Sequence, residues 1–223
     1  MKAMILAAGR GERLRPLTDQ VPKPLVAAGG KPLIVHLIEG LVRAGIADII
    51  VNTAHLGEKI QAALKDGRAL GATIRYSPEE GALETGGGIF QALPLLGEDP
   101  FLVVNGDIGT AFPFERLKHQ PVDLAHLVLV PNPPHHPQGD FHLDGDRACD
   151  SGSPRLTFGG IGLYRPALFE GCRAGRFPLA PLLRSAMAAD RVSAECWDGF
   201  WMDIGTLERL ETFDRHLRET GSL

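Results

Sequence analysis

The sequence AMILAAGRGERLRPLTDQVPKP occupies residues 3–24 and decides the fold, because an apolar strand runs directly into a glycine-rich cationic loop. Gly9 and Gly11 carry no Cβ, so backbone N–H groups can approach a ligand closely. Free N–H groups in such a loop form a cradle for phosphate, and arginine and lysine side chains neutralise its charge. Lys23 stands between two prolines, which stiffen the backbone around it. The loop therefore predicts a polyphosphate site.

The spacing of the loop separates it from two other nucleotide-binding motifs. Read as Gly-x-Gly-x-x-Gly, it has Leu14 at the position of the third glycine, which disfavours a dinucleotide-dependent dehydrogenase. It also lacks the Gly-Lys-Ser/Thr ending of a P-loop. An ordinary turn with surface cations is the simpler alternative, but such a turn does not need this many constrained residues.

Short apolar runs alternate with helical patterns through the first half of the chain. Four runs predict strands, at 3–7, 48–52, 72–76 and 101–105. Three windows have helical periodicity, at 33–42, near 58–64 and at 88–96. This alternation predicts an α/β fold, with a Rossmann-like, mostly parallel sheet and helices on both faces. Ligands bind beyond the carboxyl ends of such strands, so the loop and Asp107 are expected at the same edge.

The second half of the chain has a different pattern. Its proline-dense segment 131–137 excludes a regular helix or a central strand. Polar strand-like pieces follow at 140–143 and 156–164, and helices are predicted near 178–188 and at 207–217. We expect one domain over residues 1–223, with an inserted, partly antiparallel lobe at about 131–165 that covers one side of a ligand site.

Composition limits the classes of partner. The 223 residues carry a formal net charge of -4, without the basic excess of a nucleic-acid-binding protein. The three cysteines lie far apart and form no CxxC pair, so neither a zinc site nor a disulfide framework is indicated. No apolar run has membrane-spanning length, and the apolar start is too short for a signal peptide. We expect a cytoplasmic protein without nucleic-acid or membrane partners, either a monomer or a weak homo-oligomer.

Four segments together resemble the sugar-1-phosphate nucleotidyltransferases. They are the opening loop, LETGGG at 83–88, NGD at 105–107 and WMDIGT at 201–206. The resemblance covers nearly the whole chain. It implies Mg²⁺-dependent transfer of a uridylyl group from UTP to a sugar 1-phosphate, with release of pyrophosphate. N-Acetylmuramic acid α-1-phosphate is the acceptor that it implies, which would place the reaction in peptidoglycan recycling.

Several alternatives stay open at this point. Within the family, the pair of substrates could be dTTP with a glucose phosphate or GTP with a mannose phosphate. Outside it, the chain could be a nucleotide-sensing module without activity. The presence of Lys23, Asp107 and Asp203 speaks against such a module, because a silent relative would commonly lose one of them.

The resemblance implies a role for each motif. Asp107 and Asp203 would hold the Mg²⁺, and Lys23 and Arg13 would balance the charge that builds during attack on the α-phosphorus. Because the attacking phosphate is already an anion, positioning carries the reaction and no general base is needed. The residues expected to bind the nucleotide are Ala8, Gly9, Gly11, Glu12, Arg13, Lys23, Glu79, Gly86, Gly87 and Gly88.

The sugar side is expected to use Asn105, Asp140 and Gly160, with small residues in 159–162 admitting the ring. Many relatives carry a Glu-Lys-Pro segment whose lysine binds the sugar phosphate, and this chain has none. Arg155 is the remaining candidate for that contact.

Two further features leave questions open. Glu84 stands where the family usually has glycine, and it could either cap the following helix or shape the pocket. The pair His135-His136 could suggest a metal site, but adjacent histidines do not share a face and the segment is rich in proline. We expect these histidines to lie in a loop.

Overall fold

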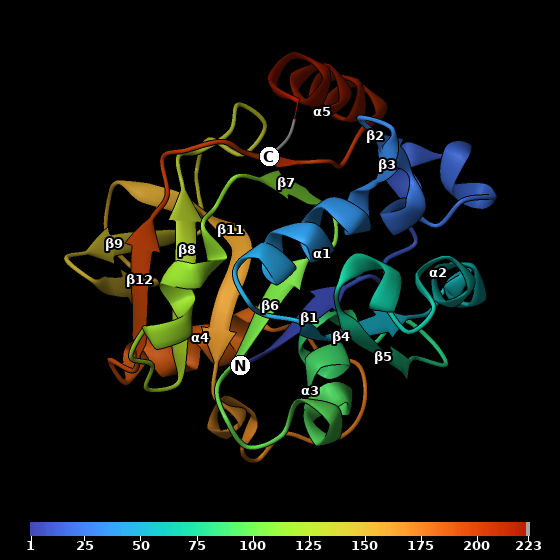
Figure 1. Ribbon diagram of the computed structural model, residues 1–223. Helices are drawn as coiled ribbons and strands as arrows, with labels where there is room; N and C mark the ends of the chain where they lie inside the picture. The colour runs from blue at the N-terminus through green and yellow to red at the C-terminus, as the bar shows by residue number, and fades with distance from the viewer. Residues whose placement is uncertain (222–223) are drawn as a thin grey trace.

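The computed structural model describes residues 1–221 and contains, within them, a nine-stranded sheet flanked by helices (Figure 1). The strands lie in the order β5-β4-β1-β6-β11-β8-β12-β10-β9. Their bounds are β1 Lys2–Leu6, β4 Asp48–Thr53, β5 Thr73–Pro78, β6 Phe101–Asn105, β8 Ala125–Val130, β9 Phe141–Asp144, β10 Arg147–Cys149, β11 Arg155–Tyr164 and β12 Val192–Cys196.

Two small sheets, five α-helices and six short 3-10 helices complete the described chain. The small sheets pair β2 (Ala27–Ala28) with β3 (Lys31–Pro32), and β7 (Ile108–Thr110) with β13 (Trp201–Asp203). The helices are α1 Leu33–Arg43, α2 Gly57–Leu64, α3 Glu84–Leu96, α4 Ala180–Ala188 and α5 Leu207–Thr220. Each of the described helices is too short or too polar to span a lipid bilayer.

The fold is a mixed α/β fold, and the prediction of a mostly parallel sheet is wrong. In the described sheet, the four parallel pairs are β5–β4, β4–β1, β1–β6 and β12–β8. The other neighbouring pairs are antiparallel, starting where β11 lies between β6 and β8. The difference has a physical reason, because β9, β10 and β11 follow one another through short turns, and short turns return a strand antiparallel. Helical crossovers join the strands of the first half, and in the second half α4 lies between β11 and β12, the strand that pairs in parallel with β8.

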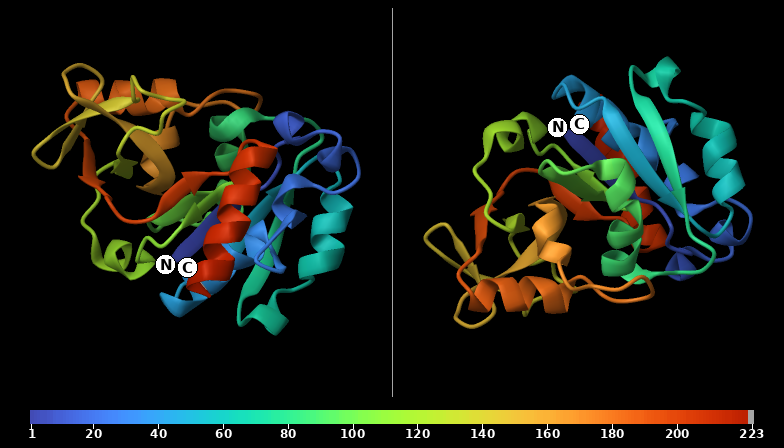
Figure 2. Two further views of the ribbon diagram at one scale, coloured as in Figure 1. Left: turned by 90° about the horizontal axis from the view of Figure 1, so that it is seen from above. Right: turned by 90° about the horizontal axis from the view of Figure 1, so that it is seen from below.

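The two faces of the sheet bury two separate apolar clusters. In β1, Ala3 and Ile5 point to the cluster that includes α1 and α2, while Met4 points to the cluster under α3 and α4. This alternation follows from the two-residue repeat of a strand. Figure 2 shows helices on both sides of the sheet. A third cluster packs α5 against the chain around Ala28 and Leu33.

The predicted strands of the first half are confirmed to within about two residues, and so are the helices at 33–42 and 58–64. The helices predicted near 178–188 and at 207–217 are also present, as α4 and α5. In the large sheet, β8, β10 and β12 were not among the predicted strands. The antiparallel strands of the segment 131–165 extend the large sheet, and the division of the chain into one domain with a lobe stays a prediction.

Candidate active site

Two clefts meet at the carboxyl end of β6. The first, which we call the loop cleft, has a volume of about 270 Å³ and is lined by the ends of β1, β4 and β6, by Lys23 and by the segment 82–85. The second, the histidine cleft, has a volume of about 310 Å³ and is lined by His135, His136 and Trp201, among others. Asn105 and Asp107 line both clefts. Ligands in the two clefts would therefore touch the same strand end.

The glycine-rich loop is held in a tight course by its own backbone. Gly11 has φ +65°, a conformation that glycine adopts without strain, and its carbonyl accepts a hydrogen bond from Thr18 Oγ1 at 2.9 Å. Ala8 and Gly9 line the loop cleft, whereas Gly11, Glu12 and Arg13 lie outside its lining. The structure thus brings only part of the predicted phosphate loop to the cleft.

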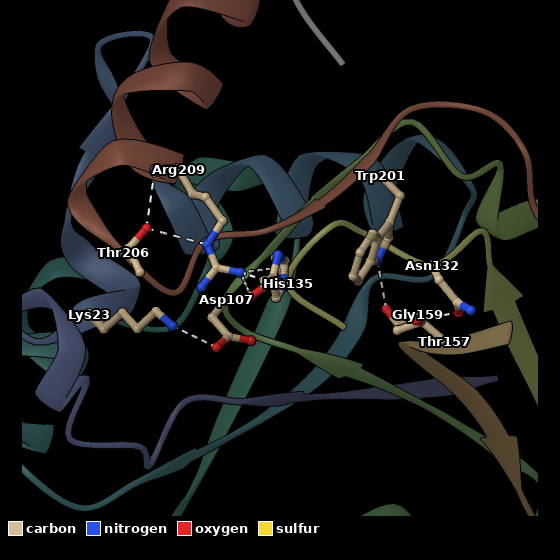
Figure 3. Close-up of polar contacts among 10 residues, drawn as sticks. Lys23, Asp107, Asn132, His135, Thr157, Gly159, Trp201, Thr206 and Arg209 are labelled. Carbon is tan, nitrogen blue, oxygen red and sulfur yellow. Dashed lines mark hydrogen bonds and ion pairs between the residues drawn. The ribbon is translucent and has the colours of Figure 1, made fainter. Parts of the chain in front are cut away.

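Lys23 and Asp107 both line the loop cleft. Their side chains point toward one another (Figure 3). Lys23 Nζ lies 2.6 Å from Asp107 Oδ2, and the lysine side chain is only 10% exposed while that of Asp107 is 37% exposed. A charge-assisted hydrogen bond at this distance fixes both groups. Its position at the junction of the two clefts leaves the carboxylate open to a ligand from either side.

Asp203 lies beside Asp107 because β13 pairs with β7. Ile204 N–H donates to the Asp107 carbonyl at 2.7 Å, and both carboxylate side chains line the histidine cleft. Arg209 Nη1 donates to Asp203 Oδ1 and Oδ2, each at 2.6 Å. Thr206 Oγ1 in turn accepts from Arg209 Nε at 3.3 Å and caps α5. The first turn of α5 therefore orients Asp203.

Two neighbours of Asp203, His135 and Arg209, were not predicted to contact it. His135 Nε2 lies 2.9 Å from Asp203 Oδ1. The same nitrogen lies 2.6 Å from Arg209 Nη1 (Figure 3). Arg13 approaches the same turn, since a Cβ at Gly205 would lie 2.8 Å from Arg13 Nη2. Thr206 marked the start of the helix, but no local pattern paired Arg209 or His135 with Asp203.

The donor set suits a hard cation. Within residues 1–221 no group of three or more histidine, cysteine, aspartate or glutamate side chains could enclose a metal ion by itself. Mg²⁺ does not need such a cage, since it keeps several waters and is held by one or two carboxylates together with phosphate oxygens. Asp107 and Asp203 are the residues that fit this role.

Glu79 lines the loop cleft, but both of its oxygens are occupied by protein donors. Oε1 accepts from Asn52 Nδ2 at 2.7 Å, and Oε2 accepts from Leu83 N–H at 3.1 Å. Asn52 Oδ1 accepts from Ala7 N–H at 2.7 Å. Asn52, which sequence analysis did not single out, thus ties the ends of β1 and β4 to Glu79. The pair shapes the wall of the cleft.

The glycines at 86–88 do not form the predicted turn, because α3 already begins at Glu84. They are buried and lie outside the lining of the loop cleft. Gly87 N–H donates to the Phe177 carbonyl at 3.0 Å, and a Cβ at Gly87 would lie 2.2 Å from the Gly175 carbonyl oxygen. These glycines let the segment 175–177 pack against the start of α3, and the approach of a base to them stays a prediction.

Glu84 has φ +60°, in the left-handed region that favours glycine. Its Oε1 accepts from Arg176 Nε at 2.8 Å, which adds a second contact between α3 and the segment 175–177. This backbone conformation explains why the family usually has glycine at the position of Glu84. Glu84 also lines the loop cleft.

Replacing Gly87 with alanine is expected to lower the stability by about 1–3 kcal/mol, because the added methyl meets a backbone carbonyl that cannot rotate away. The thermal midpoint should fall by several degrees in a chain of this size. Gly81→Ala is the matched control, since nothing lies within 4 Å of a Cβ there. Equal midpoints for the two variants in calorimetry would contradict the close packing of 175–177 on α3.

Asn105 and Gly160 are brought together by a bulge in β11. The register with β8 shifts between Phe158 and Ile161, and Gly160 has φ +70°. A Cβ at Gly160 would lie 2.6 Å from Asn105 Nδ2. Both residues line the histidine cleft, so the predicted substrate residues Asn105 and Gly160 form one wall of it.

Asp140 and Arg155 lie outside the linings of both clefts. Asp140 Oδ2 accepts from Phe158 N–H at 2.8 Å, and Oδ1 lies 3.1 Å from His136 Nε2. Arg155 Nη2 donates to the Asp150 carbonyl at 2.7 Å. The structure therefore places Asp140 behind a histidine of the cleft, and it leaves Arg155 away from the cleft lining.

A parallel sheet edge that presents a glycine-rich cationic loop opposite two carboxylates is the arrangement of nucleotidyl transferases, and the chain belongs to that family. The family model for nucleotidyl transferase matches residues 2–141. This range contains the loop, Glu79 and Asp107, but not Asp203.

Particular relatives extend the similarity over nearly the whole chain. An N-acetylmuramate alpha-1-phosphate uridylyltransferase of Neisseria meningitidis serogroup B is 52% identical over 221 residues, covering 95% of this chain and 96% of the relative. The enzyme of that name from Caulobacter vibrioides is 35% identical, with 91% of each chain covered. A solved structure from Bacillus anthracis, recorded as a candidate glucose-1-phosphate thymidylyltransferase, superposes with a TM-score of 0.86 at 22% identity, covering 98% and 96% of the two chains.

Proposed function

We propose that this chain transfers a uridylyl group from UTP to N-acetylmuramic acid α-1-phosphate, giving UDP-N-acetylmuramic acid and pyrophosphate. The two clefts that share Asn105 and Asp107 carry the proposal, because the reaction must bring two phosphate-bearing substrates together. The choice of base and sugar follows the names of the relatives that are 52% and 35% identical. The reaction would serve peptidoglycan recycling, in the cytoplasm.

The loop cleft would bind the triphosphate. The backbone at Ala8 and Gly9 forms part of its lining, and the side chain of Lys23 supplies a positive charge beside it. Arg13 stands outside the lining, next to the turn that follows Asp203, where a long side chain can reach the departing phosphates. Preorganised cations of this kind stabilise the charge that develops as pyrophosphate leaves.

The histidine cleft would bind the sugar 1-phosphate, with its phosphate toward Asp107. Mg²⁺, held by Asp107 and Asp203, would neutralise phosphate charge on both substrates. Arg209 keeps both oxygens of Asp203 oriented, and Asn105 offers an amide at the junction. A phosphate oxygen of the sugar could then attack the α-phosphorus in line, since the two substrates meet at one strand end.

A second pair of substrates has a specific observation in its favour. A mannose-1-phosphate guanylyltransferase catalytic subunit beta of Xenopus tropicalis is 32% identical over 220 residues, covering 92% of this chain and 61% of the relative. Guanylyl transfer to mannose 1-phosphate is therefore the second candidate reaction.

Pyrophosphate release across a matrix of four nucleoside triphosphates and several sugar 1-phosphates tests the proposal. UTP with N-acetylmuramic acid α-1-phosphate is expected to give the highest kcat/KM by at least about tenfold, since a site built for one substrate leaves polar groups unpaired with another. Faster turnover of GTP with mannose 1-phosphate would replace the proposed substrates. No turnover of any pair in Mg²⁺ would favour a nucleotide-sensing module.

A further inference from the structure

The segment 132–140 is a rigid loop on the wall of the histidine cleft. Asn132 Nδ2 donates to the carbonyls of Pro137 and Arg155, at 3.1 and 2.9 Å. Asp140 N–H donates to the Leu156 carbonyl at 2.8 Å, which fastens the other end of the loop to β11. Prolines within the segment restrict its backbone further. The loop therefore presents its side chains in fixed positions.

His136 is held by one ring nitrogen only. Its Nε2 lies 3.1 Å from Asp140 Oδ1, and Asp140 is fixed in turn because its Oδ2 accepts from Phe158 N–H at 2.8 Å. An ionised carboxylate can only accept hydrogen bonds, so the Nε2–H group of His136 donates to it. Within residues 1–221, Nδ1 of His136 has no protein partner. That nitrogen remains available to a ligand in the cleft that His136 lines.

Charge in the histidine cleft singles out His136. The acidic lining residues are Asp107 and Asp203, and the basic ones are His135 and His136. His135 is already engaged with Asp203 and Arg209. His136 is therefore the basic side chain of the lining that has a ring nitrogen left for an anionic group of the sugar away from its phosphate. An imidazolium donates from both nitrogens, to Asp140 through one and to a ligand through the other.

We propose that His136 binds the carboxylate of the lactyl ether that distinguishes N-acetylmuramic acid from N-acetylglucosamine. This inference rests on the proposed function, because it names the group of the acceptor that the cleft selects. Asp140 is then a positioning residue, which holds the ring through its 3.1 Å contact with Nε2. The predicted contact of Asp140 with the sugar is replaced by an indirect role through His136.

The test compares two acceptors, N-acetylmuramic acid α-1-phosphate and its carboxamide, which is identical in shape but neutral. In the wild-type chain, kcat/KM for the acid is expected to exceed that for the amide by about 10- to 100-fold, the value of a hydrogen bond to a charged group. In His136→Asn this ratio is expected to fall to about one, since the partner of the charge is gone. His119→Asn, at an exposed histidine outside both clefts, is the matched control and should keep the wild-type ratio.

Each outcome decides the inference. A His136→Asn ratio equal to that of the wild type overturns it, and so does an equal loss on both acceptors, which marks a merely structural role. If the wild-type chain turns over the acid but His136→Asn keeps the wild-type ratio of acid to amide, the proposed function holds and the inference about His136 is wrong. Absence of wild-type turnover of the acid would overturn both.

Discussion

Asp203→Asn is expected to lower kcat by about 10³-fold or more, because an uncharged amide is a poor ligand for a divalent cation whose charge stabilisation contributes several kcal/mol. The fold should survive, since asparagine has the same shape and its oxygen can still accept from Arg209 Nη1. Single-turnover measurement of pyrophosphate release at saturating UTP would show the loss, and raised Mg²⁺ should recover part of it.

The matched control is Asp198→Asn, which removes the same charge from an exposed position five residues earlier. Its kcat should stay within about twofold of the wild type, because exposed charges contribute little. A metal ligand should lose far more than about tenfold in kcat on this substitution. If Asp203→Asn kept more than about one tenth of the wild-type kcat, Asp203 could not hold the catalytic cation. Circular dichroism and the thermal midpoint separate loss of activity from loss of fold.

Lys23→Met is expected to lower kcat by about 10²–10³-fold, the usual cost of removing one preorganised charge from the reacting phosphates. Methionine fills a similar volume in a slot where the lysine side chain is only 10% exposed. Asp107 loses its 2.6 Å partner at the same time, so its affinity for Mg²⁺ should rise while turnover falls. Steady-state kinetics over a range of Mg²⁺ concentrations would reveal this opposite pair of changes.

Lys31→Met provides the control for Lys23→Met. Lys31 also pairs with a carboxylate, Glu39, but its side chain is half exposed and lies on another part of the chain. The Lys31→Met variant should keep a kcat close to that of the wild type. Its stability should change by about 0.5 kcal/mol or less. Equal kinetic effects of the two substitutions would show that Lys23 acts through overall charge rather than through its position.

The parallel half of the sheet could be predicted because its strands are short apolar runs separated by helices, and each helix brings the chain back in the same direction. In the antiparallel half, the strands predicted at 140–143 and 156–164 are present as β9 and β11. The position of β11 between β6 and β8 could not be predicted, since it depends on contacts that no local pattern records. The strand β8 is buried along its whole length and so lacks the polar-apolar alternation that marks a half-exposed strand.

Some contacts of the candidate site could be predicted from the sequence, and others could not. Lys23 and Asp107 could be expected to meet because each follows a strand that ends at one edge of the sheet, and the structure brings them together. His135 and Asp203 are 68 residues apart in sequence, and their contact depends on where the proline-rich loop returns over the sheet. The run of glycines at 86–88 cannot by itself distinguish a base-binding segment from close packing, because close packing between two protein segments requires glycine as much as a bound base does.

The two clefts that join at Asn105 and Asp107 also define what an inhibitor should look like. A compound with one arm in each cleft pays the entropic cost of association once, and its second arm binds at a high effective concentration. A nucleoside diphosphate sugar has this two-armed shape. The enzyme would therefore retain its own product more tightly than either substrate, and accumulated product would slow further synthesis.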